Sequence, residues 1–305
     1  MEFLVAGFEI IEQESGLEGI FKQAELPGRI CYGSQDKMAP GTAEKFVNGL
    51  MKSNHGAPLE HGSVYLKADD EYHGNPLDKY RDNPYSKLRS VNGTKYVSTN
   101  LRVLFENGWL KDLEDYLCEP TEYHEKRYTV RFTVDRFTGE EFLRHRKASF
   151  NRESTRYVLF TKEKFGGGSI KYIIPPWILD DKSRIEGYAE QDIDFYIDTM
   201  REHLRTKQPL DDIFAWTFAL KSAEWSYCYL VNECGWKAEQ ARTVLPCAIN
   251  SPLIKTAFLS DWKHFFLLRA IGTTGKPHPQ ASELAVPLME EFVERGYMEK
   301  IEYIN

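Results

Sequence analysis

One short segment of this sequence concentrates positive charge in a chain that is acidic overall. The chain carries 39 Lys and Arg residues against 46 Asp and Glu, which gives a net charge of −7. Arginine presents a planar fork of donors that suits phosphate and carboxylate oxygens, and nearby Ser149, Asn151 and Ser154 add uncharged donors. The segment predicts a local anion site for two phosphorylated ligands, or else an exposed basic turn with surface ion pairs. Its basic side chains, which surround the single acid Glu153, are Arg144, His145, Arg146, Lys147, Arg152 and Arg156.

Composition excludes several other classes of function. A net negative charge disfavours a general nucleic-acid surface, because phosphate neutralisation needs a basic face. Residues 1–9 lack the basic start of a signal peptide, and no apolar run approaches the roughly 20 residues that span a bilayer, so we expect a cytoplasmic protein with no membrane partner. The five cysteines form no C-x-x-C pair, so we expect reduced thiols and no metal site. They are Cys31, Cys118, Cys228, Cys234 and Cys247.

The elements around the basic segment follow from periodicity and capping signals. Strict alternation of apolar and polar residues over 128–135 predicts a strand with one core face. Thr138 and Glu141 have the spacing of a capping box, which predicts a short helix from 142 to about 148. Residues 149–151 have low helix propensity. Beyond them we expect β-like structure at 157–160 and 170–174, separated by a turn at 166–168.

Helices dominate the rest of the chain. Apolar pairs predict an amphipathic helix over 43–51 that ends near 52–54. Residues 213–234 are apolar on nearly every face and stop at Gly235, so we expect a buried helix with a C-terminal glycine. A shorter helix carries Arg242 and ends before Pro246, and two more are predicted over 261–269 and 282–293. Together the elements predict an α+β fold with a mixed or antiparallel sheet and a mainly helical C-terminal half.

The basic segment resembles a known signature. Arg144, His145 and Arg146, followed after seven residues by Ser154, resemble the R-H-R-x7-S pattern of the flavin-dependent thymidylate synthases. Segments 29–32, 55–61, 241–246, 265–269 and 278–280 resemble further segments of that family in the same order. The resemblance implies the fold of that family and one catalytic domain over 1–305. Residues 69–125 fall outside the resemblance and look like a long surface insertion.

The resemblance implies a reaction and its cofactors. Such an enzyme methylates dUMP to dTMP, takes the carbon from 5,10-methylenetetrahydrofolate, and uses NADPH to reduce FAD. It implies that Ser154, Arg156 and Arg242 hold the nucleotide phosphate, and that Arg269 is the catalytic group, which hydrogen-bonds uracil and favours its N3-deprotonated form. No protein nucleophile is needed, and a homotetramer with shared active sites is expected. The full substrate-binding set is Glu141, Arg144, Arg152, Ser154, Arg156, Arg242 and Arg269.

The resemblance also implies a flavin site, with departures from the family pattern. Phe258 and Ser260 replace an Asn-x-Arg pair, and His264 replaces a later Asn, so FAD must be held partly by other groups or less tightly. The cofactor-binding set is Cys31, His55, Ala57, Glu60, Arg144, His145, Arg146, Ser149, Asn151, His264, His278 and Gln280.

At two positions expected to bind the substrate, the charge of the side chain differs from the family pattern. Glu141 stands where the family usually has Gln, and Arg152 where it has Glu. Glu141 is either the acid of the capping box, paired with a local arginine, or part of an altered substrate pocket. The second reading leaves open a pyrimidine nucleotide hydroxymethylase or a dCMP-directed relative. A protein that binds nucleotide or RNA through the arginines without catalysis is the alternative from another class.

Overall fold

The computed structural model describes residues 1–70, 74–156, 158–160 and 169–301. Its centre is an antiparallel sheet in the order β2-β6-β9-β7, in which β6 is the strand predicted from alternation. Val130, Phe132 and Val134 of the apolar face are fully buried. The sheet consists of β2 (Gly7–Ile11), β6 (Arg127–Thr133), β9 (Leu253–Phe258) and β7 (Ser149–Arg152).

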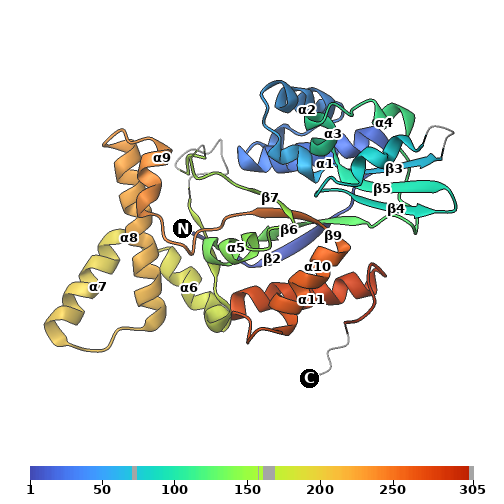
Figure 1. The fold of residues 1–305 in the computed structure, drawn as a ribbon. Coiled ribbons are helices and arrows are strands. Elements are labelled where there is room, and N and C mark those ends of the chain that lie inside the picture. The colour runs from blue at the N-terminus through green and yellow to red at the C-terminus, as the bar shows by residue number, and fades with distance from the viewer. Residues whose placement is uncertain (71–73, 157, 161–168, 302–305) are drawn as a thin grey trace.

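Two helices cover the apolar face of this sheet. They are α10 (Leu259–Phe266) and α11 (Pro279–Glu294), which lie together on one side of it in Figure 1. Trp262, Phe265 and Phe292 are fully buried between helices and sheet. A π-helical turn, Leu267–Ile271, follows α10 directly and carries Arg269. The helix that packs on the main core therefore leads directly into the turn that carries Arg269, the expected catalytic residue.

A second sheet lies on the other side of the molecule. It has the order β3-β5-β4 and is antiparallel. Leu77 and Tyr80, within the expected surface insertion at 69–125, are fully buried in a core shared with α1 and α2. That segment therefore forms part of a packed unit; its status as an insertion into one catalytic domain stays a prediction. The unit contains α1 (Gly16–Cys31), α2 (Thr42–Lys52), β3 (Ser63–Asp69), β4 (Lys87–Val91), β5 (Thr94–Asn100), α3 (Leu101–Glu106) and α4 (Asp112–Asp115).

The remaining helices extend away from both sheets (Figure 1). No helix formed by the described residues has the length and hydrophobicity to cross a bilayer. A parallel pair, β1 with β8, connects this region to the N-terminus, and β8 confirms the strand expected near 170–174. The elements are β1 (Glu2–Val5), β8 (Lys171–Ile174), α6 (Lys182–Ala189), α7 (Ile193–Thr206), α8 (Asp212–Asn232) and α9 (Ala238–Ala241).

The long helix α8 differs from the prediction in its burial. It ends before Gly235, whose φ of 71° suits glycine, as expected. Phe214, Leu220 and Tyr227 are buried, but Trp225 and Tyr229 are 51% and 48% exposed. The expectation of burial on nearly every face was wrong, because neighbouring elements cover only part of the helix surface. The α+β class, the antiparallel central sheet and the mainly helical C-terminal half are confirmed.

The helix before the basic segment begins earlier than predicted. It is α5 (Arg136–Leu143), and its N-cap is Asp135 rather than Thr138. Asp135 accepts a hydrogen bond from the backbone N of Thr138 at 3.0 Å, and the Thr138 hydroxyl itself donates to Asp135. The predicted helix over 142–148 was wrong because an aspartate cap was available three residues upstream.

The segment after α5 also departs from expectation. Residues 149–152 form β7, and no strand occurs at 158–160, where β-like structure was expected. Residue 157 and the expected turn at 166–168 lie outside the described residues.

Candidate active site

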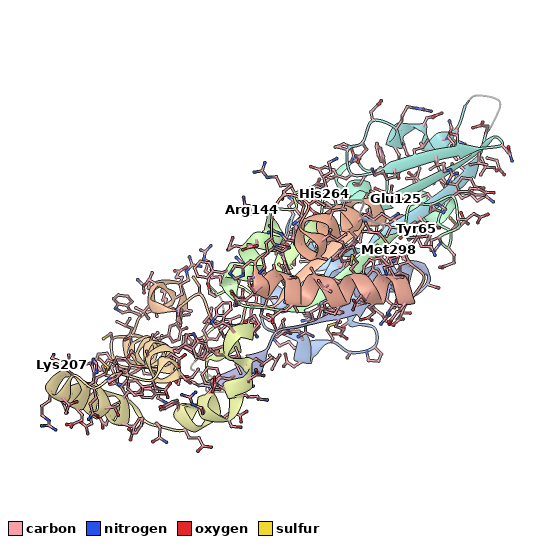
Figure 2. All side chains as sticks on the ribbon, turned by 90° about the horizontal axis from the view of Figure 1, so that it is seen from below. Tyr65, Glu125, Arg144, Lys207, His264 and Met298 are labelled. Carbon is pink, nitrogen blue, oxygen red and sulfur yellow. The ribbon has the colours of Figure 1, made fainter. Side chains whose placement is uncertain are left out.

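A pocket of about 880 Å³ lies between the end of α5, α10 and residues 274–278. This volume falls within the range usual for small-molecule sites. Figure 2 shows Arg144 and His264, which both line the pocket, close together near the middle of the elongated molecule. Among the described residues, the only acids in the lining are Glu141 and Asp261, so the pocket favours an anionic ligand. The cations that line it are Arg144, Arg146, Lys147, Lys255, Arg269 and Lys276.

Arg269 is held in the pocket wall by groups at the end of α5. Its Nη1 lies 2.8 Å from Glu141 Oε2, and its Nη2 donates to the Glu141 carbonyl oxygen at 3.1 Å. Its Nε donates to His145 Nε2 at 3.2 Å. The Arg269 side chain is 17% exposed and that of Glu141 is 30% exposed, so the ion pair is partly withdrawn from solvent. Glu141 thus pairs with an arginine that is distant in sequence, instead of the local one expected.

His145 is a neutral member of the basic segment. It is 9% exposed, and burial together with the charges of Lys255 and Arg269 lowers its pKa to about 3. The imidazole is therefore uncharged near neutral pH, and its Nε2 accepts the hydrogen bond from Arg269. This arrangement places the proton of the neutral ring on Nδ1. His145 can orient the guanidinium without adding a further positive charge.

The three residues expected to hold a nucleotide phosphate form a separate group. Arg242 Nη1 lies 3.5 Å from the Thr155 hydroxyl, which places Arg242 beside the Ser154 to Arg156 segment. Arg156 Nε pairs with Glu239 of α9 at 3.0 Å, and its side chain is 57% exposed. Ser154, Arg156 and Arg242 are not in the lining of the pocket that contains Arg269. The structure brings these three residues together but not to that pocket.

Some expected flavin contacts lie where α1 meets the central sheet. The Cys31 thiol donates to the Arg152 carbonyl oxygen at 3.3 Å, and Asn151 Nδ2 lies 3.3 Å from Cys31 Sγ. Burial raises the pKa of this thiol. Ser149 Oγ accepts from Arg127 at 3.3 Å. The Cys31 contacts join α1 to β7, the Ser149 contact joins β6 to β7, and none of these three expected residues lines the pocket.

The segment 55–61 is also outside the pocket lining. His55 Nδ1 lies 3.3 Å from the Tyr32 hydroxyl, and Glu60 pairs with Arg102 at 2.5 Å. Ala57 begins the 3-10 turn Ala57–His61. These residues lie on the unit that carries the second sheet.

The other expected contacts divide between the pocket and its surroundings. His264 and His278 line the pocket, as Arg144 and Arg146 do. Gln280 lies outside the lining and donates to Asp135 at 3.0 Å. Arg152 also lies outside, where it pairs with Glu140 at 2.6 Å.

The two substituted positions on β9 and α10 are not in the pocket either. The Arg127 guanidinium lies 5.5 Å from the centroid of the Phe258 ring, and the Ser260 backbone N donates to Glu125. Neither residue belongs to the lining, which includes Asp261 and His264 of the same region.

Sequence reasoning missed Lys255 of the pocket lining. It lies in the middle of β9 and has no exposed surface. Its Nζ lies 4.0 Å and 3.8 Å from the ring centroids of Trp262 and Phe265. Burial lowers the pKa of this amine well below its usual value. The available signal was one lysine inside a strand that otherwise reads as apolar, between Ile254 and Thr256.

Comparison with known proteins gives consistent matches. The family model described as thymidylate synthase complementing protein matches residues 120–295. Over 198 residues the chain is 26% identical to the flavin-dependent thymidylate synthase of Pyrococcus furiosus, covering 63% of this chain and 67% of that protein. It is 23% identical to the enzyme of the same name from Thermococcus kodakarensis, covering 63% and 66%. The match spans about two thirds of the length of these relatives.

Two solved structures are also similar to this chain. They are of the UMP/dUMP methylase PolB from Streptomyces cacaoi, bound with 5-Br dUMP or with 5-Br UMP. Each has a TM-score of 0.41, at 18% and 17% identity. The alignments cover 96% of this chain in both cases, and 93% and 91% of the other chains.

Proposed function

The chain belongs to the thymidylate synthase complementing protein family, and we propose that it is an FAD-dependent enzyme that methylates dUMP to dTMP. The proposal includes 5,10-methylenetetrahydrofolate as carbon donor and NADPH as reductant. The observation that carries it is the cationic pocket in which Glu141 and His145 fix Arg269. A cytoplasmic location and a homotetramer belong to the same proposal.

The pocket residues fit a flavin nucleotide. The excess of cations suits a pyrophosphate, and Lys255 offers a buried ammonium without a hydrogen-bond partner among the described residues. Arg144, Arg146, His264 and His278 would hold the cofactor from the lining. When bound, FAD supplies the hydride that the methylation needs.

Arg269 would act on the base of the nucleotide. A fixed guanidinium stabilises negative charge that develops on uracil O2 and N3, and His145 keeps it oriented through Nε. Because Glu141 already pairs with Nη1, a uracil that contacts this face must share or replace that carboxylate. Ser154, Arg156 and Arg242 would bind the phosphate. Their separation from the pocket lining supports sites shared between subunits of a tetramer.

Glu141 also supports a second candidate, a dCMP-directed or hydroxymethylating relative. An ionised carboxylate only accepts hydrogen bonds, and the N4 amino group of cytosine donates them, whereas uracil O4 is an acceptor. Glu141 lies in the pocket lining beside Arg269. Mass spectrometry of the products from dUMP and dCMP distinguishes a methyl from a hydroxymethyl group on each base.

The decisive experiment loads the purified chain with FAD and supplies the full substrate mixture. We expect a flavin absorbance band that NADPH bleaches, and dTMP as a product. A protein that retains no FAD and forms no dTMP would contradict the proposal. Nucleotide binding that falls steeply with salt, without any flavin signal, would instead favour the non-catalytic binding protein.

Replacing Arg269 tests its catalytic role. We expect Arg269→Ala to abolish turnover while dUMP still binds, because the phosphate contacts come from other residues. Arg156→Ala is the matched variant: it should raise the nucleotide concentration required, since a phosphate anchor acts in ground and transition state alike. Steady-state kinetics with dUMP as the varied substrate measure both. Full turnover by Arg269→Ala would refute the assignment.

A further inference from the structure

Lys255 is a fully buried lysine whose amine has no hydrogen-bond partner among the described residues. It lies on the core face of β9, where its cross-strand neighbours are Val130 and Phe150. Its Nζ lies over the rings of Trp262 and Phe265, 4.0 Å and 3.8 Å from their centroids. A methionine or leucine would fill the same space without burying a donor, and buried amines are costly when unpaired.

The surroundings of Lys255 disfavour a proton on it. Burial lowers the pKa of Lys255, and the charge of Arg269 lowers it further. The carboxylate of Asp261 raises this pKa but accepts no hydrogen bond from Lys255 in the described structure. Lys255 in turn contributes to the lowered pKa of His145, so these groups repel positive charge from one another. The other titratable and charged groups of the pocket lining are Glu141, Arg144, Arg146, Lys147, His264, Lys276 and His278. A negative ligand would relieve the repulsion.

We propose that Lys255 is a ligand-binding residue of the pocket, whose ammonium donates to an anionic oxygen of a bound nucleotide. The inference rests on the proposed function, because the ligand is taken to be FAD or dUMP. Two observations carry it: Lys255 belongs to the pocket lining, and its donor is buried and unpaired. The cationic lining identifies the missing acceptor as a phosphate oxygen or an anionic oxygen of the base.

The first test is the affinity of Lys255→Met for FAD and for dUMP, measured separately by titration calorimetry. Loss of a charged hydrogen bond should weaken binding of one of them by about 10- to 100-fold. The nucleotide whose affinity falls is the one that supplies the oxygen. The matched control is Lys67→Met, because the Lys67 ammonium also lies over an aromatic ring, that of Tyr96 at 5.9 Å, outside the pocket. The control should bind both nucleotides as the unmodified protein does.

The second test is proton uptake on binding, from calorimetry in buffers of different ionisation enthalpy between about pH 6 and 9. Because burial lowers the pKa of Lys255, an anion bound beside it should raise that pKa and favour the protonated amine, so the unmodified protein should take up more protons than Lys255→Met. A structural lysine would not change proton uptake. Lys255→Gln keeps a donor but cannot titrate, so it should also lose this uptake. Melting temperatures establish that each variant is folded.

The outcomes separate this inference from the proposed function. If the unmodified protein binds neither FAD nor dUMP, the proposed function fails and the role of Lys255 fails with it. If it binds them and the Lys255 variants match it in affinity and in proton uptake, the function stands and Lys255 is only a core residue.

Discussion

Glu141 and Arg269 form an ion pair inside a pocket whose other charges are mainly positive. The pair fixes the guanidinium but also neutralises part of the charge that an anionic base would contact. Glutamine at the same position would keep a hydrogen bond to Arg269 without the negative charge. The identity of residue 141 therefore controls how strongly the pocket attracts an electron-rich base.

We predict that Glu141→Gln shifts nucleotide preference toward uracil. The amide retains an acceptor for Arg269, and the net charge near the base becomes more positive. The ratio of dUMP to dCMP affinity should rise by about tenfold, equivalent to ~1.4 kcal/mol, as expected for one hydrogen bond to a charged group. Competitive binding of the two nucleotides to the same preparation measures this ratio.

Glu140→Gln is the control for this change. It removes one acid at the neighbouring position, but Glu140 pairs with Arg152, and neither residue lines the pocket. Its ratio of affinities should equal that of the unmodified protein. An equal shift in both variants would mean that overall charge, and not the contact with Arg269, sets the preference.

The sequence predicted the residue types of the site better than their arrangement. Charge contrast with an acidic chain located Arg144 and Arg146, and the family resemblance located Arg269. The sequence could not locate Lys255, because one lysine in a strand gives no sign of whether its ammonium reaches solvent. It also could not show that Arg156 and Arg242 lie outside the pocket, since that depends on packing between distant elements.

The position of α5 determines where the Arg-His-Arg segment begins. Asp135 caps the helix through Thr138 and also accepts from Gln280 of α11, and it is 3% exposed. Both Asp135 and Thr138 are good caps by residue type, so the sequence alone did not distinguish them. The contact with α11 favours Asp135, and such a long-range contact is not visible in local spacing.

We predict that Asp135→Ala lowers the free energy of unfolding by about 1–3 kcal/mol, because it removes the cap and leaves buried donors unpaired. Asp135→Asn should cost less, since one oxygen still accepts from the backbone of Thr138. Urea denaturation followed by circular dichroism measures both changes. If Thr138→Ala lowers the free energy of unfolding more than Asp135→Ala does, Thr138 rather than Asp135 is the residue that caps α5.

The two sheets are joined through the polar face of the central sheet. His61, in the 3-10 turn before β3, places Nδ1 2.7 Å from the Thr256 hydroxyl on β9, which lies 2.7 Å from that of Thr129 on β6. Alternation correctly predicted a polar face on β6 but not its burial: Thr129 is 3% exposed. Polar residues on one face of a strand do not show whether water or another unit covers them.

This junction makes stability depend on pH. His61 is fully buried, and burial followed by the charge of Arg127 lowers its pKa to about 3. Below about pH 6.5, His61 therefore binds a proton in the unfolded chain but stays neutral in the folded chain. The free energy of unfolding falls as the pH decreases from there toward 3. The loss is about 1.4 kcal/mol per pH unit from this one group.

Between pH 7 and 5, the unmodified protein should lose about 2 kcal/mol more stability than His61→Asn, in which the titrating group is absent. Urea unfolding at the two pH values gives each loss as a difference within one variant, so any constant cost of the substitution cancels. His203→Asn is the control: His203 is half-buried near the end of α7, away from the junction, and this variant should follow the unmodified protein. Equal losses for His61→Asn and the unmodified protein would show that the junction tolerates a charged histidine, and that the two units are less tightly joined than these contacts indicate.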